Sequence, residues 1–298
     1  MTRRWLVTGC SSGLGSALAA AVARAGDDVV ATTRRPGQLA PLVKEFPGRI
    51  TEAVLDVTDA ERCRAVVEFA AGRLGGIDVL VNNAGRGLFG AVEEVSDEEL
   101  RAQLELLVVA PWRLTREVLP LMRAQGGGHV VNVSSLAGRM AFPGLAAYCA
   151  GKYALEGMSQ ALAAEAAAFG VRVTVLEPGG FATGYGASVV PAAASVPVYA
   201  PVVEPMMAGL RGMDGNPGLG RPEDFAALVL RVVAAGPVPL RLPVGADAFG
   251  YLGALHDAAA LELAAAREFT HGLAVAGAES LPGARTGTES AGSPVQPA

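Results

Sequence analysis

Residues 8–15 read Thr8-Gly9-Cys10-Ser11-Ser12-Gly13-Leu14-Gly15. This stretch follows a short apolar run that ends at Val7, and it precedes a helical pattern from Leu14 to Ala25. The glycines let backbone amides approach a pyrophosphate, and the start of the following helix offers free N–H groups and a favourable dipole. We therefore predict a phosphate-binding turn between a first strand and a first helix. The alternative is an ordinary glycine-rich turn.

Apolar runs alternate with helical patterns beyond this turn. We expect helices near residues 59–73, 96–123 and 147–169, and strands near residues 5–7, 29–32, 50–55, 79–81, 129–133 and 171–176. The strands are continuously apolar, which is typical of parallel strands buried on both faces. Ser96 and Glu99 form a capping box at the start of one long helix, and Pro111 should interrupt it. The fold class predicted is α/β, a doubly wound parallel sheet of the Rossmann type in a single domain.

The pattern loosens after Pro178. Residues 179–220 are rich in Gly, Pro and Ala and carry few charges, so they are either disordered or a flap over a substrate. We expect the pattern to resume with helices near 221–235 and 247–271 and a strand near 240–244. The catalytic domain is expected to span residues 1–276, and the polar residues 277–298 are expected to be a disordered tail.

Composition excludes several classes of partner. The chain has 298 residues, of which 51% are hydrophobic, and a net charge of −5, which gives no reason to expect nucleic acid or an anionic membrane as a partner. Its three cysteines, Cys10, Cys63 and Cys149, fit no metal-site spacing, so we expect no metal and a reducing compartment. Neither a signal peptide nor an apolar run long enough to cross a bilayer is visible, so we expect a cytoplasmic protein.

The second expected strand indicates which nucleotide would bind. Proteins that bind NAD often place an acid about 20 residues after the glycine-rich turn, where it holds the ribose 2′-hydroxyl. Residues 29–44 contain no acid, and Arg34 and Arg35 follow the strand directly. Guanidinium groups suit a 2′-phosphate, and the Ser11 hydroxyl could add a contact. This pattern favours NADP(H) over NAD(H); the alternative is a pair of solvated arginines.

Three side chains have the chemistry of a proton-transfer site. Tyr148 and Lys152 are four residues apart on a predicted helix and share a face. Ser135 follows a predicted strand, at the end of the sheet where ligands bind in such folds. A nearby Lys152 ammonium would favour the Tyr148 phenolate, as would an oxidised nicotinamide, and Tyr148 could then exchange a proton with a carbonyl or alcohol oxygen. Ser135 could stabilise charge on that oxygen.

These motifs together resemble the short-chain dehydrogenase/reductase family, over about residues 3–250. The matching residues are the glycine-rich turn, Asp56-Val57, Asn82-Asn83-Ala84-Gly85, Ser135, Tyr148-x-x-x-Lys152, and Pro178-Gly179 with Thr183. The resemblance implies that Asp56 and Val57 flank the adenine and that Asn82, Ala84 and Gly85 line its ribose. It also implies that Lys152 holds the nicotinamide ribose and that Thr183 and the backbone after Pro178 hold the carboxamide. The expected cofactor contacts are Gly9, Ser11, Ser12, Gly13, Leu14, Gly15, Arg34, Asp56, Val57, Asn82, Ala84, Gly85, Tyr148, Lys152, Pro178, Gly179 and Thr183.

One position departs from the family pattern. Many members carry an asparagine in the helix before the fifth strand, and this chain has Leu107 there. The family's proton relay is thought to use that residue's backbone carbonyl, which survives the substitution. We therefore expect activity to be retained, with a helix kink that Pro111 helps to supply.

The expected function is hydride transfer between NADP(H) and the carbonyl or alcohol of a small molecule. Side chains of the flap are apolar, and no Lys or Arg falls between Arg172 and Arg211, which favours a neutral, apolar substrate. The same residues could simply pack the flap on the core. Alternatives are an epimerase, dehydratase or enoyl reductase of the same fold, or a non-catalytic nucleotide-sensing protein. Relatives pair through two long helices, here about 97–123 and 148–169, so the resemblance implies a homodimer or homotetramer.

Overall fold

A computed structural model of the chain describes residues 2–213 and 216–270. The chain divides into two compact units, residues 1–255 and residues 256–298, and the described part of the second unit belongs to one helix, α10 (Ala246–Thr270). The expected domain end at residue 276 and the expected tail, residues 277–298, lie outside the described residues. Within the described ranges, no helix combines the length and apolar character needed to cross a bilayer.

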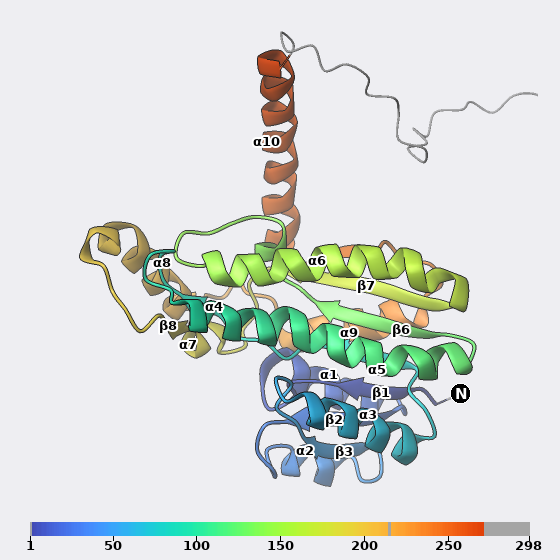
Figure 1. Cartoon of the computed structure of the whole chain (residues 1–298). Helices are drawn as coiled ribbons and strands as arrows, with labels where there is room; N and C mark the ends of the chain where they lie inside the picture. Colours follow the sequence, from blue (N-terminus) through green and yellow to red (C-terminus); the bar gives the residue numbers. More distant parts are fainter. Residues whose placement is uncertain (1, 214–215, 271–298) are drawn as a thin grey trace, which may run out of the picture. The chain divides into compact units, whose positions relative to one another are not determined.

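Seven parallel strands form one sheet within the described residues, in the order β3-β2-β1-β4-β6-β7-β9 (Figure 1). They are β1 (Arg4–Val7), β2 (Asp28–Thr33), β3 (Ile50–Val54), β4 (Val79–Asn82), β6 (Gly128–Val133), β7 (Val171–Pro178) and β9 (Arg241–Val244). The chain builds outward from β1 first on one side and then on the other. This arrangement confirms the predicted doubly wound α/β fold, in which ligands bind where the strand order reverses, here between β1 and β4.

Helices cover both faces of the sheet (Figure 1). Each face has its own apolar core. One core contains Trp5, Leu18 and Phe225, and the other contains Leu6 and Leu80. Trp5 and Leu6 are neighbours in β1 and point to opposite faces, which is why the strands read as unbroken apolar runs. The first core packs against α1 (Gly13–Arg24) and α9 (Pro222–Ala234), beside α2 (Ala40–Glu45), and the second against α3 (Ala60–Leu74), α5 (Ala110–Ala124) and α6 (Ala146–Ala166).

The long helix predicted over residues 96–123 is interrupted. Ser96 and Glu99 form the expected capping box at the start of α4 (Asp97–Leu104). A π-helical turn, Glu105–Val109, then separates α4 from α5. Pro111 has no N–H group, so it cannot donate to the Leu107 carbonyl, the acceptor four residues before it in an α-helix. The interruption that Pro111 predicts therefore takes the form of a widened turn.

The flap, residues 179–220, is folded in its described part and fastened to the loop after β4. It contains α7 (Tyr185–Ser188), β8 (Val190–Pro191), a 3-10 turn (Pro197–Tyr199) and α8 (Ala200–Gly212). β8 pairs in parallel with β5 (Leu88–Phe89). The Glu99 carboxylate accepts a hydrogen bond from the Ala193 amide at 2.9 Å, and the Glu94 carboxylate accepts one from the Val196 amide at 2.8 Å. The described residues of this segment are therefore ordered, and its role as a flap over a substrate stays a prediction.

His129 is a titratable group enclosed in the sheet. It is 1% exposed in β6, and its Nε2 lies 2.9 Å from the Thr174 hydroxyl of β7. Burial, with a smaller contribution from the charge of Arg172, lowers the pKa of His129 to about 3. The imidazole is therefore neutral in the folded protein throughout the physiological range of pH.

We predict that His129→Gln reduces the loss of stability in acid. Below pH ~6.5 the unfolded chain binds a proton on His129 that the folded protein takes up only near pH ~3, so the free energy of unfolding falls by about 1.4 kcal/mol per pH unit in that window. Urea unfolding at a series of pH values between these limits should show a smaller acid slope for His129→Gln. His256→Gln, on an exposed part of α10, is the control and should keep the wild-type slope. Equal slopes in wild type and His129→Gln would contradict the prediction.

Candidate functional site

A cleft of about 780 Å³ opens at the carboxyl ends of the strands, where the sheet order reverses. Its walls are the glycine-rich turn, the loops after β2, β3 and β4, the end of β6, one face of α6 and the start of the flap. Most of the residues expected from the sequence line it: Gly9, Ser11, Ser12, Gly13, Leu14, Arg34, Asp56, Val57, Ala84, Gly85, Ser135, Tyr148, Lys152, Pro178, Gly179 and Thr183. Asn82 and Gly15 do not.

The glycine-rich turn is shaped to leave open space. Gly9 and Gly13 have φ angles of 71° and 57°, a left-handed conformation that favours glycine. A Cβ atom at Gly9 would lie 2.7 Å from the Ala84 Cα atom, so a side chain would collide with the opposite wall. No side chain caps the start of α1 at Ser12, which leaves the first N–H groups of the helix available to an anion.

Asn83, whose role the sequence reasoning did not assign, fixes this turn to the end of β4. Its side-chain amide donates to the carbonyls of Thr8 and Gly9, at 2.9 and 3.0 Å. Its backbone N–H donates to the Thr8 hydroxyl at 3.0 Å. The sequence shows two adjacent asparagines, Asn82 and Asn83, but it does not indicate which of them contacts the turn.

Asn82 has a structural place instead. It is 4% exposed, and its amide donates to the Asn132 side chain of β6 at 2.8 Å. The Asn132 amide in turn donates to the Ser159 hydroxyl of α6 at 2.8 Å. This buried chain ties β4, β6 and α6 together behind the cleft. Gly15 likewise packs the helix on the turn, since a Cβ atom there would lie 2.3 Å from the Gly9 carbonyl oxygen.

Positive charge gathers at the corner of the cleft beside β2 and β3. Hydrogen bonds from Thr58 lower the pKa of the Asp56 carboxyl, and the charges of Arg34 and Arg86 lower it further. Both arginines line the cleft, whereas Arg35 is not among its lining residues. Glu52 of β3 is the nearby acid, but its carboxylate accepts hydrogen bonds from the Thr33 hydroxyl and from backbone amides of the loop after β2. The corner therefore suits an anionic group, and Arg86 is a second cation that the sequence reasoning missed.

Ser135, Tyr148 and Lys152 line the cleft together. Ser135 follows β6, and its hydroxyl accepts a hydrogen bond from the Ala137 amide at 3.1 Å. Tyr148 and Lys152 lie one turn apart on α6, and the Lys152 Nζ atom is 5.7 Å from the centre of the Tyr148 ring. The Lys152 ammonium also donates to the Val133 carbonyl at 2.8 Å, which anchors it to β6.

Burial sets the protonation of these side chains. Burial raises the pKa of Tyr148, and the hydroxyl groups of Tyr185 and Ser135 partly oppose this effect by lowering the pKa. Burial also lowers the pKa of Lys152 to about 8, although the negative charge of Glu156 acts to raise it. Sequence reasoning expected Lys152 to favour the Tyr148 phenolate, whereas in the structure the groups that favour it are two hydroxyls. The reason is geometric: the ammonium is directed to a backbone carbonyl, and Tyr148 lies in an apolar cluster.

Leu107 fills the position of the family's asparagine with apolar volume. It is 1% exposed in the π-helical turn. A Cβ atom at Gly151 of α6 would lie 2.9 Å from Leu107 Cδ1, and one at Gly85 would lie 3.2 Å from Cδ2. The leucine thus occupies space that the two glycines leave free, directly beside Lys152.

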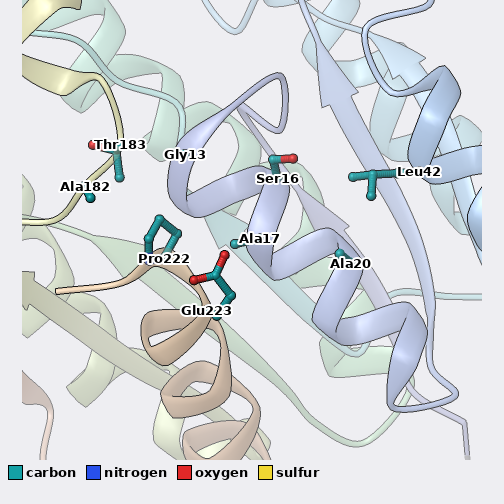
Figure 2. A pocket seen from close by; sticks show the side chains of 9 residues that line it. All are labelled: Gly13, Ser16, Ala17, Ala20, Leu42, Ala182, Thr183, Pro222 and Glu223. Carbon is teal, nitrogen blue, oxygen red and sulfur yellow. The ribbon is translucent and has the colours of Figure 1, made fainter. Parts of the chain in front are cut away.

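A second, smaller hollow of about 300 Å³ lies between the start of α1 and the start of α9 (Figure 2). Ser16, Thr183 and Glu223 supply its polar side chains, and the rest of its lining is small or apolar. Gly13 and Thr183 border both hollows. Tyr148 and Lys152 line only the larger cleft of the two, so that cleft is the candidate active site.

The chain is similar to known oxidoreductases in sequence and in fold. Residues 3–193 match the model of the family described as short chain dehydrogenase. Oxidoreductase BOA17 from Botryotinia fuckeliana (strain B05.10) is 40% identical over 254 residues, which are 85% of this chain and 92% of the relative. The crystal structure of a short-chain dehydrogenase from Streptomyces avermitilis is 42% identical, with a TM-score of 0.84, and covers 91% of this chain and 98% of its own. A metagenomic short-chain oxidoreductase solved in complex with NADP is 28% identical, with a TM-score of 0.65, over 81% of this chain and 96% of its own.

The fold and the cleft define a Rossmann-type α/β protein with its candidate site at the reversal of the strand order. Within that class, the chain belongs to the short-chain dehydrogenase/reductase family of oxidoreductases, as the resemblance of its motifs predicted.

We predict that Leu107→Asn destabilises the protein without increasing its turnover number. An amide there would be buried among apolar atoms, which should lower the free energy of unfolding by about 2 kcal/mol. Leu107→Met, which conserves apolar volume, should cost less than about 1.5 kcal/mol. Urea unfolding and steady-state kinetics of both variants check this. A faster turnover of Leu107→Asn would show that the missing amide limits the natural protein.

Proposed function

We propose that this protein is an NADP(H)-dependent oxidoreductase that interconverts a carbonyl and an alcohol, with Tyr148 as the general acid and base. The observation that carries the proposal is that Ser135, Tyr148 and Lys152 line the same cleft as the glycine-rich turn and Arg34. A proton-transfer group and an anion-binding turn in one cleft are what hydride transfer from a dinucleotide needs.

The residues of the cleft fit NADP(H). The open turn, with uncapped N–H groups at the start of α1, suits a pyrophosphate. Arg34 and Arg86 suit a 2′-phosphate on the adenosine ribose. The metagenomic relative solved in complex with NADP supports this choice. The remaining expected contacts of the lining, from Asp56 to Thr183, complete the proposed binding site; Asn82 and Gly15 would act through packing.

The proposed chemistry divides between the cofactor and three side chains. When bound, NADPH supplies the hydride that the carbonyl carbon accepts. Tyr148 donates its phenolic proton to the carbonyl oxygen, so that an alcohol forms, and in the reverse direction it removes that proton. Ser135 donates a hydrogen bond to the same oxygen and stabilises its developing charge. Lys152, held by the Val133 carbonyl, orients the nicotinamide ribose.

The substrate is proposed to be neutral and apolar. Tyr148 belongs to a buried cluster with Phe89, Leu145 and Val189, beside Phe142. Methionine and leucine side chains of α8 pack against the same cluster. Arg139, which lies in the same loop as Ser135, is paired with the buried Glu177 carboxylate at 3.0 Å, so it is not free to bind an anionic substrate. An apolar ketone, or the matching alcohol, fits these walls.

A homodimer or homotetramer is proposed through α5 and α6. Trp112 of α5 is 56% exposed. The alanines of α6 that would allow close helix packing are exposed and do not pack on the sheet: Ala150, Ala154, Ala161 and Ala164. Exposed apolar surface on two neighbouring helices favours an interface with a second copy.

We predict that Tyr148→Phe lowers the turnover number by at least about 100-fold, because proton transfer by a positioned side chain contributes about that much or more. NADPH consumption with a panel of neutral apolar ketones measures the effect. Tyr153→Phe, on the exposed face of the same helix, is the matched control and should keep its rate. NADPH affinity should survive in both variants, so a loss of binding would be recognised separately. Equal rates for wild type and Tyr148→Phe would defeat the assignment.

We predict that Arg34→Ala weakens NADPH binding about tenfold or more while leaving NADH binding nearly unchanged, because a charge-assisted hydrogen bond is worth about 1.5–3 kcal/mol. Fluorescence titration of the two nucleotides measures both affinities. Arg35→Ala removes the adjacent cation, which does not line the cleft, and should change neither. If Arg34→Ala weakens NADPH and NADH equally, Arg34 does not read the 2′-phosphate.

A further inference from the structure

Tyr185 places a second phenol beside the first. It begins α7 in the flap, and its ring centre lies 5.9 Å from that of Tyr148, with the planes tilted by 51°. The Tyr185 hydroxyl is buried and makes no hydrogen bond of good geometry in the described part of the chain. It is close enough to the Tyr148 hydroxyl for each to shift the pKa of the other. A buried hydroxyl whose hydrogen bonding is incomplete is costly, so its presence beside Tyr148 calls for a role.

The flap holds this hydroxyl from two sides. On one side the Val190 amide donates to the Gly87 carbonyl at 3.0 Å, where β8 pairs with β5. A Cβ atom at Gly87 would lie 2.7 Å from the Tyr185 oxygen, so the phenol tip rests almost on the backbone. On the other side α7 meets α8 closely, because a Cβ atom at Gly186 would lie 1.8 Å from the Leu210 carbonyl oxygen. The position of the hydroxyl is therefore set by backbone contacts.

The titratable groups around Tyr148 differ in whether they can donate a hydrogen bond to its oxygen. Lys152 lies on the same helix and directs its ammonium to the Val133 carbonyl. Cys149, also on α6, is buried and raises the pKa of both tyrosines, as a like charge would. Tyr185, from α7, has a pKa well above its ordinary value because of burial and the neighbouring Tyr148, and it lowers the pKa of Tyr148. The raised pKa of Tyr185 keeps its O–H group available as a hydrogen-bond donor.

We propose that Tyr185 is a second catalytic phenol, whose O–H donates a hydrogen bond to the Tyr148 oxygen whenever that oxygen carries negative charge. The proposal rests on the proposed function, since Tyr148 becomes negatively charged when it gives its proton to a carbonyl oxygen. No bond to carbon forms at Tyr185, and its proton stays on its own oxygen. The interaction strengthens as charge develops, so it favours the transition state over the neutral resting state.

Tyr185→Phe tests the proposal with a readout that needs neither substrate nor cofactor. The ionisation of each of the five tyrosines can be followed by NMR of the protein labelled with ¹³C at the ring carbon bonded to oxygen. Tyr148→Phe identifies the Tyr148 signal. Tyr185→Phe should raise the pKa of Tyr148 by about one unit, which is about tenfold less phenolate at a given pH. The acid limb of the pH profile of alcohol oxidation should shift upward by the same amount.

Two further variants separate this role from packing. Tyr199→Phe removes a hydroxyl of the same flap, one that donates to the exposed Glu93 carboxylate at 2.9 Å, and should leave the pKa of Tyr148 unchanged. Gly87→Ala keeps the phenol but displaces its hydroxyl, and should reproduce the upward shift of Tyr185→Phe. Circular dichroism of each variant verifies the fold.

The outcomes are distinct. An unchanged or lowered pKa of Tyr148 in Tyr185→Phe overturns the proposal. A raised KM for the carbonyl substrate at an unchanged pKa also overturns it, because Tyr185 would then contact the substrate. If the wild-type protein reduces no ketone while Tyr185→Phe still raises the pKa of Tyr148 by NMR, the proposed function is overturned and the coupling of the two phenols stands.

Discussion

The hydrogen bonds from the Asn83 amide to the carbonyls of Thr8 and Gly9 join the two strand ends between which the sheet reverses. Chain connections leave β1 and β4 in opposite directions, so a crevice is unavoidable at that point. The amide keeps the glycine-rich turn against one wall of the crevice, and the left-handed Gly9 keeps it open. The other walls of the cleft are arranged around this fixed edge.

Opposed physical effects meet at the proposed reaction centre. Burial disfavours charge on both Tyr148 and Lys152, so it raises the pKa of the phenol and lowers that of the ammonium. Burial also strengthens each hydrogen bond that faces a developing charge, because little water competes for it. The hydroxyl groups of Ser135 and Tyr185 oppose burial at Tyr148. Two neutral hydroxyl donors therefore favour the charged form of Tyr148, against the effect of burial.

The sequence predicted what local spacing encodes and missed what long-range packing decides. The four-residue spacing of Tyr148 and Lys152 guaranteed a shared helix face, and the unbroken apolar strands predicted the covered parallel sheet. The sequence did not show which of Asn82 and Asn83 contacts the glycine-rich turn, because this depends on the residue at which the strand ends. Strands of two residues, such as β5 and β8, are too short to show a periodic pattern in the sequence. The contact between Tyr148 and Tyr185 could not be predicted either, because the two residues belong to distant segments that no sequence motif connects.

The fastening of the flap has an evolutionary consequence. Glu94 and Glu99 accept hydrogen bonds from the backbone N–H groups of Val196 and Ala193, and any residue except proline carries such a group. Mutations in this segment can therefore exchange its side chains without removing these two N–H donors. The attachment of this segment can therefore be inherited while its side chains diverge, because the segment contributes only main-chain donors and the two carboxylates come from residues outside it.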